Sequence, residues 1–153
     1  MLTCSIVDQW FEEDTPIYVH PRDPFKRIDT LHSSRPIRIS LANHVLAESS
    51  YSVRLHEPLL PTRYYVPYTS IRTIYLRPST TTTECPYKGV ANYHSAVIGG
   101  ERYEDLVWWY RATTREAGMI EGLRCFYNER VDIDIRDEDG VWRRIERPVQ
   151  KLI

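Results

Sequence analysis

Short runs in which apolar and polar residues alternate make up most of the chain from residue 37 onward. A period of two is typical of strands that bury one face, and many such runs separated by turn residues indicate an antiparallel sheet protein. Between the first two runs, Asn43-His44 fits the tight turn of a hairpin, which places His44 at a loop tip. The segments expected to form strands are 37–41, 45–48, 53–57, 63–67, 71–76, 80–85, 91–98, 106–110, 123–127, 131–135 and 141–145.

One segment has the pattern of a short helix. Thr113 or Thr114 can cap it, Glu116 lies near its start, and Gly118 weakens its end near Met119. We expect one helix there in a mainly β fold.

The first 36 residues follow neither a helical nor a strand period and contain four prolines. We predict an extended arm over residues 1–36 and a single domain over 37–153. The arm carries six large apolar residues, which need a covering surface: Trp10, Phe11, Ile17, Tyr18, Val19 and Phe25. That surface is the arm's own domain or a second subunit, and the second case predicts a homodimer.

The composition excludes some classes of binding partner and location. With 153 residues and 42% hydrophobic content, one core is expected. Twenty basic and twenty-one acidic residues give a net charge of −1, which provides no field for a nucleic acid or an anionic membrane. No run approaches the ~20 apolar residues of a membrane span, and residues 1–10 lack the features of a secretory signal. We expect a soluble cytoplasmic protein.

The cysteines and lysines point to chemistry without a metal or another cofactor. Cys4, Cys85 and Cys125 are widely spaced and form no Cys-x-x-Cys knuckle, so free thiols are expected. The chain has seventeen arginines but only three lysines, Lys26, Lys88 and Lys151. Because lysine can release its proton far more readily than arginine, a lysine at position 88 favours proton transfer over a fixed charge.

The segment 80–89 puts a thiol, a phenol and an amine directly after a run of threonines. With Pro86 in the second position of a β-turn, Cys85 and Lys88 come within about 7 Å between Cα atoms. The pair would then supply a nucleophile or a base. The alternative is a continued strand, in which Cys85 and Lys88 point to opposite faces, Cys85 and Tyr87 pack and Lys88 is solvated.

Several motifs in this frame resemble the domain-of-unknown-function family 427, over about residues 37–135. They are Thr-Thr-Thr-Glu-Cys-Pro-Tyr-Lys-Gly at 81–89, Tyr-Tyr-Val-Pro at 64–67, Trp-x-Tyr at 108–110, and Ile-Glu-Gly-Leu, Phe-Tyr and Val-Asp between 120 and 132. The resemblance implies a β-tent, in which two antiparallel sheets meet over a cleft, as in zinc-bearing methionine sulfoxide reductase and cereblon-like domains. The segment 10–27 resembles the lead-in of fungal members, which implies a fungal source.

The sequence differs from the related proteins in two respects, which limit the functional properties that the resemblance implies for this chain. The zinc knuckles of the related domains are absent from this sequence. The family is sometimes labelled nucleotidyltransferase, but the chain has no glycine-rich phosphate loop, and Asp132-Ile-Asp134 fits the polar face of a strand.

Residues on the flanking segments complete the candidate site. In 53–57, alternation places Glu57 with Val53 and Leu55, opposite Arg54 and His56. We predict that Cys85 and Lys88 form the floor of the cleft. The candidate catalytic residues are Lys88, Cys85, Tyr93 and Glu57, and the candidate ligand-binding residues are Arg54, Tyr65, Arg72, Tyr87, His94, Trp108 and Tyr110. The alternative is a solvated polar face with Glu57 paired to an arginine and the aromatic residues in the core.

Two classes of function fit these residues. The first is an enzyme using acid–base or nucleophilic chemistry on a small carbonyl or carboxylate compound, such as cyclisation, isomerisation or lactone formation on a polyketide-like acid in fungal secondary metabolism. The second is a module that binds a small ligand or a peptide end without turnover, as cereblon-like domains do.

Overall fold

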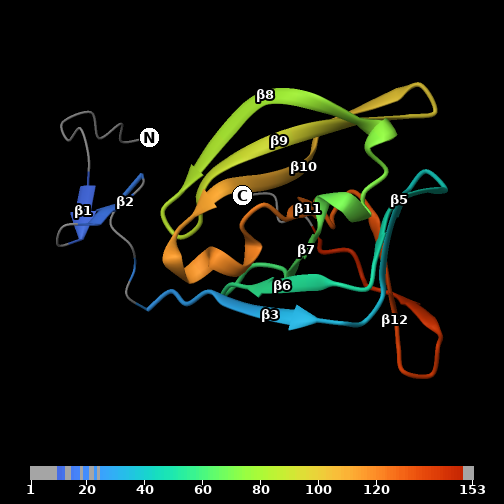
Figure 1. Cartoon of the computed structure of the whole chain (residues 1–153), viewed down its shortest axis with the longest axis horizontal. Helices are drawn as coiled ribbons and strands as arrows, with labels where there is room; N and C mark the ends of the chain where they lie inside the picture. Colours follow the sequence, from blue (N-terminus) through green and yellow to red (C-terminus); the bar gives the residue numbers. More distant parts are fainter. Residues whose placement is uncertain (1–9, 13–14, 18, 21–22, 24, 150–153) are drawn as a thin grey trace.

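The computed structural model describes residues 10–12, 15–17, 19–20, 23 and 25–149. Its strands form two large antiparallel sheets and one two-stranded hairpin made by β1 (Trp10–Glu12) and β2 (Thr15–Ile17) (Figure 1). The mainly β fold with two antiparallel sheets is therefore confirmed.

The larger sheet has seven strands in the order β3-β6-β7-β11-β10-β9-β8. They are β3 (Asp29–Ser33), β6 (Ser52–His56), β7 (Arg63–Val66), β11 (Arg124–Phe126), β10 (Glu101–Thr113), β9 (Gly89–Ile98) and β8 (Leu76–Cys85). The sheet curls along this order, so that in Figure 1 β8 and β9 lie above β3 and β6.

The smaller sheet has four strands, β13 (Trp142–Arg144), β12 (Asp132–Arg136), β4 (Ile37–Leu41) and β5 (His44–Ser49), in that order. The predicted hairpin joins β4 to β5, but its turn lies one residue earlier than expected. Ala42 and Asn43 adopt the positive φ values of 48° and 63° that a two-residue turn needs. His44 is exposed at the start of β5 and pairs with Leu41.

Two hydrophobic cores cover the two faces of the seven-stranded sheet. The first fills the space between the sheets, where Ile39 and Ile133 of the smaller sheet join Val107 and Phe126 of the larger one. The second covers the opposite face. Its members are Val53, Leu55, Tyr65, Ala91, Tyr93, Trp108, Tyr110, Ala117, Ile120 and Cys125. Because side chains alternate along a strand, the central strands β7, β11, β10 and β9 contribute to both cores.

Two predicted elements differ in the structure. The segment expected as a short helix near 113–119 is the 3-10 helix η3 (Arg115–Ile120). The strand predicted over 71–76 is wrong, because its centre forms the 3-10 helix η2 (Thr73–Tyr75), just after η1 (Tyr68–Ser70). The Tyr75 N–H bonds the Arg72 carbonyl at 3.2 Å, so local turns replace the ladder that β-branched residues favour.

The predicted arm supplies a strand of the larger sheet. Residues Asp29–Ser33 form the edge strand β3 and pair with β6 from Asp29↔His56 to Ser33↔Ser52. Of the apolar arm residues, Val19 and Phe25 are exposed. The side chains of Trp10, Phe11, Ile17 and Tyr18 lie outside the described residues.

A tight turn joins β8 to β9 as predicted. The Lys88 N–H bonds the Cys85 carbonyl at 3.3 Å, which closes a β-turn with Pro86 in its second position. Gly89 follows with a φ of +108°, and a Cβ built there would lie 2.9 Å from the Ala112 carbonyl oxygen. Any other residue at position 89 would therefore meet both backbone strain and a steric clash.

We expect Gly89→Ala to lower the free energy of unfolding by about 1–3 kcal/mol, because alanine is strained at this φ and contacts fixed backbone. Urea unfolding monitored by tryptophan fluorescence measures the change. Gly118→Ala is the matched control, since Gly118 has no positive φ and a Cβ there meets nothing within 4 Å. Equal stability of the two variants would contradict a close approach at the turn.

Candidate functional site

A buried ion pair lies at one end of the second core. Lys88 Nζ donates to Glu57 Oε2 at 2.6 Å, and the two side chains are only 13% and 5% exposed. Lys88 belongs to the β8–β9 turn and Glu57 follows β6, although β7, β11 and β10 separate β6 from β9 in the sheet. The contact joins distant parts of the sheet because the sheet curls (Figure 1).

A second lysine reaches the same carboxylate. Lys26 Nζ lies 3.8 Å from Glu57 Oε1 and 4.6 Å from the centre of the Tyr87 ring. The Tyr87 hydroxyl accepts a hydrogen bond of 2.8 Å from the Asp23 N–H, so Tyr87 ties the segment before β3 to the turn. Lys26 was not among the residues predicted for the site. Its signal was the scarcity of lysine, which applies to Lys26 as much as to Lys88.

The turn that carries Lys88 is anchored to the end of β10. The Thr114 N–H donates to the Lys88 carbonyl at 3.3 Å, and the Thr114 hydroxyl donates to the Tyr87 carbonyl at 2.5 Å. Thr114 precedes η3 as predicted, but its side chain holds the turn and makes no cap bond to the helix. Lys88 therefore extends from a fixed backbone.

Aromatic side chains on this face form what we call the aromatic wall: Tyr65, Tyr93, Trp108 and Tyr127. The Tyr65 hydroxyl accepts a hydrogen bond of 3.0 Å from Trp108 Nε1, and the two rings meet edge to face. The hydroxyls of Tyr93 and Thr83 are 2.8 Å apart, and Tyr127 packs against Trp108 with ring centres 4.5 Å apart. These bonds fix the orientation of each ring.

Arg63 supports this wall, although it was not among the residues predicted for the site. Its guanidinium donates to both carboxylate oxygens of Glu129 at 2.7 and 2.8 Å. It also lies 5.4 Å from the Trp108 ring and 5.9 Å from the Tyr127 ring. Alternation along β7 was the available signal, since it places Arg63 on the face of Tyr65. A hollow of about 360 Å³ lies beside this network, lined by Asp105, Tyr127, Glu129 and Arg130.

Burial raises the pKa of four groups on this face. It raises the pKa of Tyr65, Tyr110 and Tyr127 above the usual value for a phenol, and it raises the pKa of the Cys125 thiol. At neutral pH the three phenols are protonated, so they can donate hydrogen bonds but cannot act as bases. The charged side chains near these phenols belong to the Lys88–Glu57 pair, with Lys26 beside it, and to the Arg63–Glu129 pair.

The two described cysteines should react differently with thiol reagents. Cys85 is half-buried next to the turn, whereas Cys125 is fully buried with a raised pKa. We expect iodoacetamide at pH 8 to alkylate Cys85 faster by on the order of tenfold or more, because the thiolate is the reactive form and Cys125 holds little of it. Peptide mapping measures both rates, and equal rates would show that the second core opens readily.

Three predicted ligand-binding residues do not join this face. Arg54 lies on the opposite face of β6, with its guanidinium 5.9 Å from the Tyr64 ring. His94 also lies on the opposite face, near Trp109, and its pKa is lowered by burial and then by a nearby arginine. Arg72 is exposed between two 3-10 helices. The other eight predicted residues, Glu57, Tyr65, Cys85, Tyr87, Lys88, Tyr93, Trp108 and Tyr110, belong to the second core, the aromatic wall or the turn.

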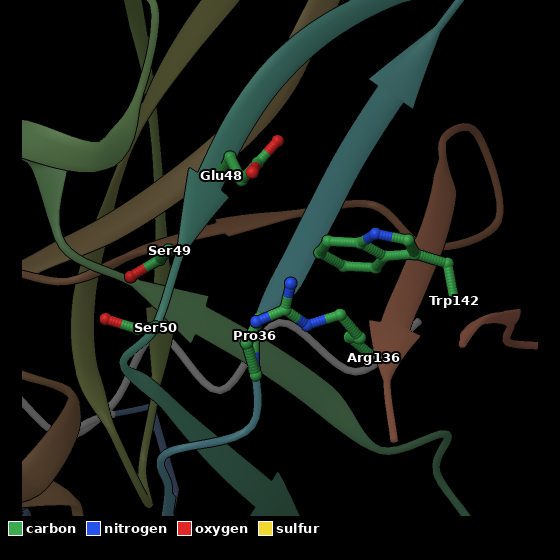
Figure 2. Close-up of a pocket in the computed structure, with 6 residues that line it drawn as sticks. All are labelled: Pro36, Glu48, Ser49, Ser50, Arg136 and Trp142. Atoms are coloured by element: carbon green, nitrogen blue, oxygen red, sulfur yellow. The ribbon is translucent and has the colours of Figure 1, made fainter. Parts of the chain in front are cut away.

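A separate hollow of about 300 Å³ lies on the smaller sheet (Figure 2). It is lined by Pro36, Glu48, Ser49, Ser50, Arg136 and Trp142. Figure 2 shows the Arg136 side chain between Pro36 and the Trp142 ring, whose centre is 5.7 Å from the guanidinium carbon. None of the residues predicted for the site lines this hollow.

No group of three or more His, Cys, Asp or Glu side chains among the described residues is arranged to hold a metal ion. No helix in the same residues is long and apolar enough to cross a membrane.

A known protein family matches most of the chain. The model of a family described as a domain of unknown function (DUF427) matches residues 29–137. The matched stretch begins at the first residue of β3 and ends just after β12, so it spans the strands that carry Glu57, Lys88 and the aromatic wall. No curated protein matches the chain.

Proposed function

The chain belongs to the family described as a domain of unknown function (DUF427), and we propose that it is an enzyme acting on a small carbonyl or carboxylate compound through Lys88 and Glu57. One observation carries this proposal. In a chain with seventeen arginines and three lysines, two of the lysines meet one carboxylate whose side chain is 5% exposed. Arginine would supply a fixed cation, whereas lysine can also transfer a proton.

The proposed chemistry is proton transfer or nucleophilic attack within the pair. Lys88 Nζ and Glu57 Oε2 are 2.6 Å apart, which is within reach for direct proton transfer from the ammonium to the carboxylate. The amine then acts as a base or a nucleophile, and the carboxyl group acts as the acid. Phenol hydroxyls of the wall, those of Tyr65 and Tyr93 among them, would donate hydrogen bonds to a substrate oxygen, and Cys85 is a second candidate nucleophile.

A binding module without turnover is the second candidate. It is favoured by the neutral aromatic wall and by the completeness of its hydrogen bonds, such as Trp108 to Tyr65 and Arg63 to Glu129. A site of this kind holds a flat apolar ligand without needing to activate it.

One experiment separates these two functions. Protein at low micromolar concentration is incubated with a fractionated small-molecule extract of its source organism, and each fraction is followed by liquid chromatography and mass spectrometry. An enzyme converts many equivalents of one compound into another, whereas a binding module removes at most one equivalent and releases it unchanged on denaturation. If no carbonyl or carboxylate compound is lost or converted, the proposed function is contradicted.

The substrate pathway and the location are proposed from the sequence. We propose a polyketide-like acid as the substrate, fungal secondary metabolism as the pathway and the cytoplasm as the location. Clustering of the gene with synthases and oxygenases would support the pathway.

We also propose a homodimer in which residues 10–25 of one chain pack on the other. The arm includes the exposed Val19 and Phe25, which a partner would cover. Light scattering at micromolar concentration should give twice the mass of one chain, and deletion of residues 1–25 should give monomers or aggregates. A monomeric intact chain would contradict the dimer.

A further inference from the structure

The position of the Lys88 side chain suits a nucleophile that attacks a carbonyl carbon. It extends from a turn that Thr114 and the close approach at Gly89 hold in place, and its side chain is 13% exposed. Its amine lies 2.6 Å from Glu57 Oε2, within reach for direct proton transfer. Lys26 brings a second positive charge to the other oxygen of the same carboxylate. Lysines that are desolvated or adjacent to another cation recur as amine nucleophiles toward carbonyl compounds.

From this geometry we infer that the Lys88 amine forms a covalent imine with an aldehyde or ketone substrate. The inference rests on the function proposed above and specifies its substrate class and its intermediate. It assigns Lys88 the role of nucleophile, Glu57 that of proton carrier, and Lys26 that of a second cation that stays beside Glu57.

The step balances with the groups present. The Lys88 ammonium gives a proton to the Glu57 carboxylate, and the neutral amine attacks the carbonyl carbon to form a C–N bond. Glu57 returns the proton to the carbinolamine oxygen, then takes a second proton from the nitrogen and passes it to the same oxygen, which leaves as water when the C–O bond breaks. The product is a protonated imine on Lys88 beside an ionised Glu57, so the pair regains its original charges.

The surroundings suit such an intermediate. The protonated imine keeps the positive charge of Lys88 next to Glu57, so the buried carboxylate stays paired throughout. Neutral phenols and the Tyr65–Trp108 pair surround this face. An apolar wall limits the water that would hydrolyse the imine. Arginine cannot take this role, because its guanidinium does not give up a proton in proteins.

Reductive trapping tests the inference on the intact wild-type chain. The protein is treated with limiting glyoxylate, a small aldehyde with a carboxylate, and sodium cyanoborohydride at neutral pH. Because the chain has three lysines, peptide mapping reads the carboxymethyl adduct at each one. We expect Lys88 to be labelled faster than Lys26 by on the order of tenfold, because Glu57 supplies the proton transfers. Burial alone gives the reverse order, since Lys26 is 31% exposed and Lys88 is 13% exposed.

Glu57→Gln supplies the second measurement. Glutamine keeps the size of the side chain but cannot carry the proton, so the labelling rate at Lys88 should fall to or below that of Lys26. Slower labelling of Lys88 than of Lys26 in the wild-type protein overturns the imine. If the extract assay then still shows conversion, the proposed enzyme remains and acts without a covalent amine intermediate. If neither labelling nor conversion is found, the imine and the enzyme fail together.

Discussion

Lys88→Arg is expected to lower the turnover found in the extract assay by about 10²-fold or more while leaving the fold intact. Arginine preserves the positive charge opposite Glu57, so the ion pair survives, but it cannot act as a base or as an amine nucleophile. Lys88→Met should lose as much activity and lower the melting temperature less than Glu57→Leu does, because methionine fills a similar volume and Lys26 still faces Glu57. Steady-state rates and thermal melts of the two variants measure both effects.

The control for this series is Arg102→Met. Arg102 is 51% exposed and pairs with Glu104 in the hairpin between β9 and β10, away from the pair. Its loss should leave both rate and stability unchanged. If the rate of Lys88→Arg stays within a few-fold of the wild-type rate, Lys88 acts as a fixed cation. Proton transfer by this residue is then contradicted.

Local features of the chain were predicted well because local chemistry determines them. The alternation of Val53, Leu55 and Glu57 places all three side chains in buried positions on one face of β6. Proline at 86 and glycine at 89 specify the turn between β8 and β9 without any distant contact. In such segments the residue types leave few conformations open.

Segment 71–76 shows where a local pattern fails. Its β-branched and aromatic residues favour a strand, yet Ile71 makes a single bridge to Ala47 and the chain then turns into η2. The Arg72 N–H bonds the Leu46 carbonyl at 2.8 Å, which ties this connection to β5 of the smaller sheet. Strand propensity depends on the availability of a partner strand, and the sequence does not show which segments lie side by side.

The site was predicted in part for the same reason. The Cys85–Lys88 turn is local, but the contact between Lys88 and Glu57 spans 31 residues and depends on the curl of the sheet. Arg54 and His94 were grouped with residues on the other face, although alternation already separates Arg54 from Leu55 and His94 from Tyr93. Strict use of the period of two would have excluded both.

Glu57→Leu should be among the most destabilising single changes at the site. It leaves the ammonium of Lys88, 13% exposed, without its carboxylate, and breaking one side of a buried pair typically costs about 3–5 kcal/mol. The double variant Glu57→Leu/Lys88→Met removes both charges, so most of that loss should be recovered. Urea unfolding of the two single variants, the double variant and the wild type measures the coupling between the two residues.

A matched surface pair separates burial from charge in this experiment. Glu48 is 51% exposed and pairs with Arg38 at 2.9 Å on the smaller sheet. Glu48→Leu should change the free energy of unfolding by no more than about 1 kcal/mol, because solvent screens an exposed pair. If Glu57→Leu lowers the free energy of unfolding as little as Glu48→Leu does, water reaches Lys88. The desolvated pair on which the proposed proton transfer depends would then not exist in solution.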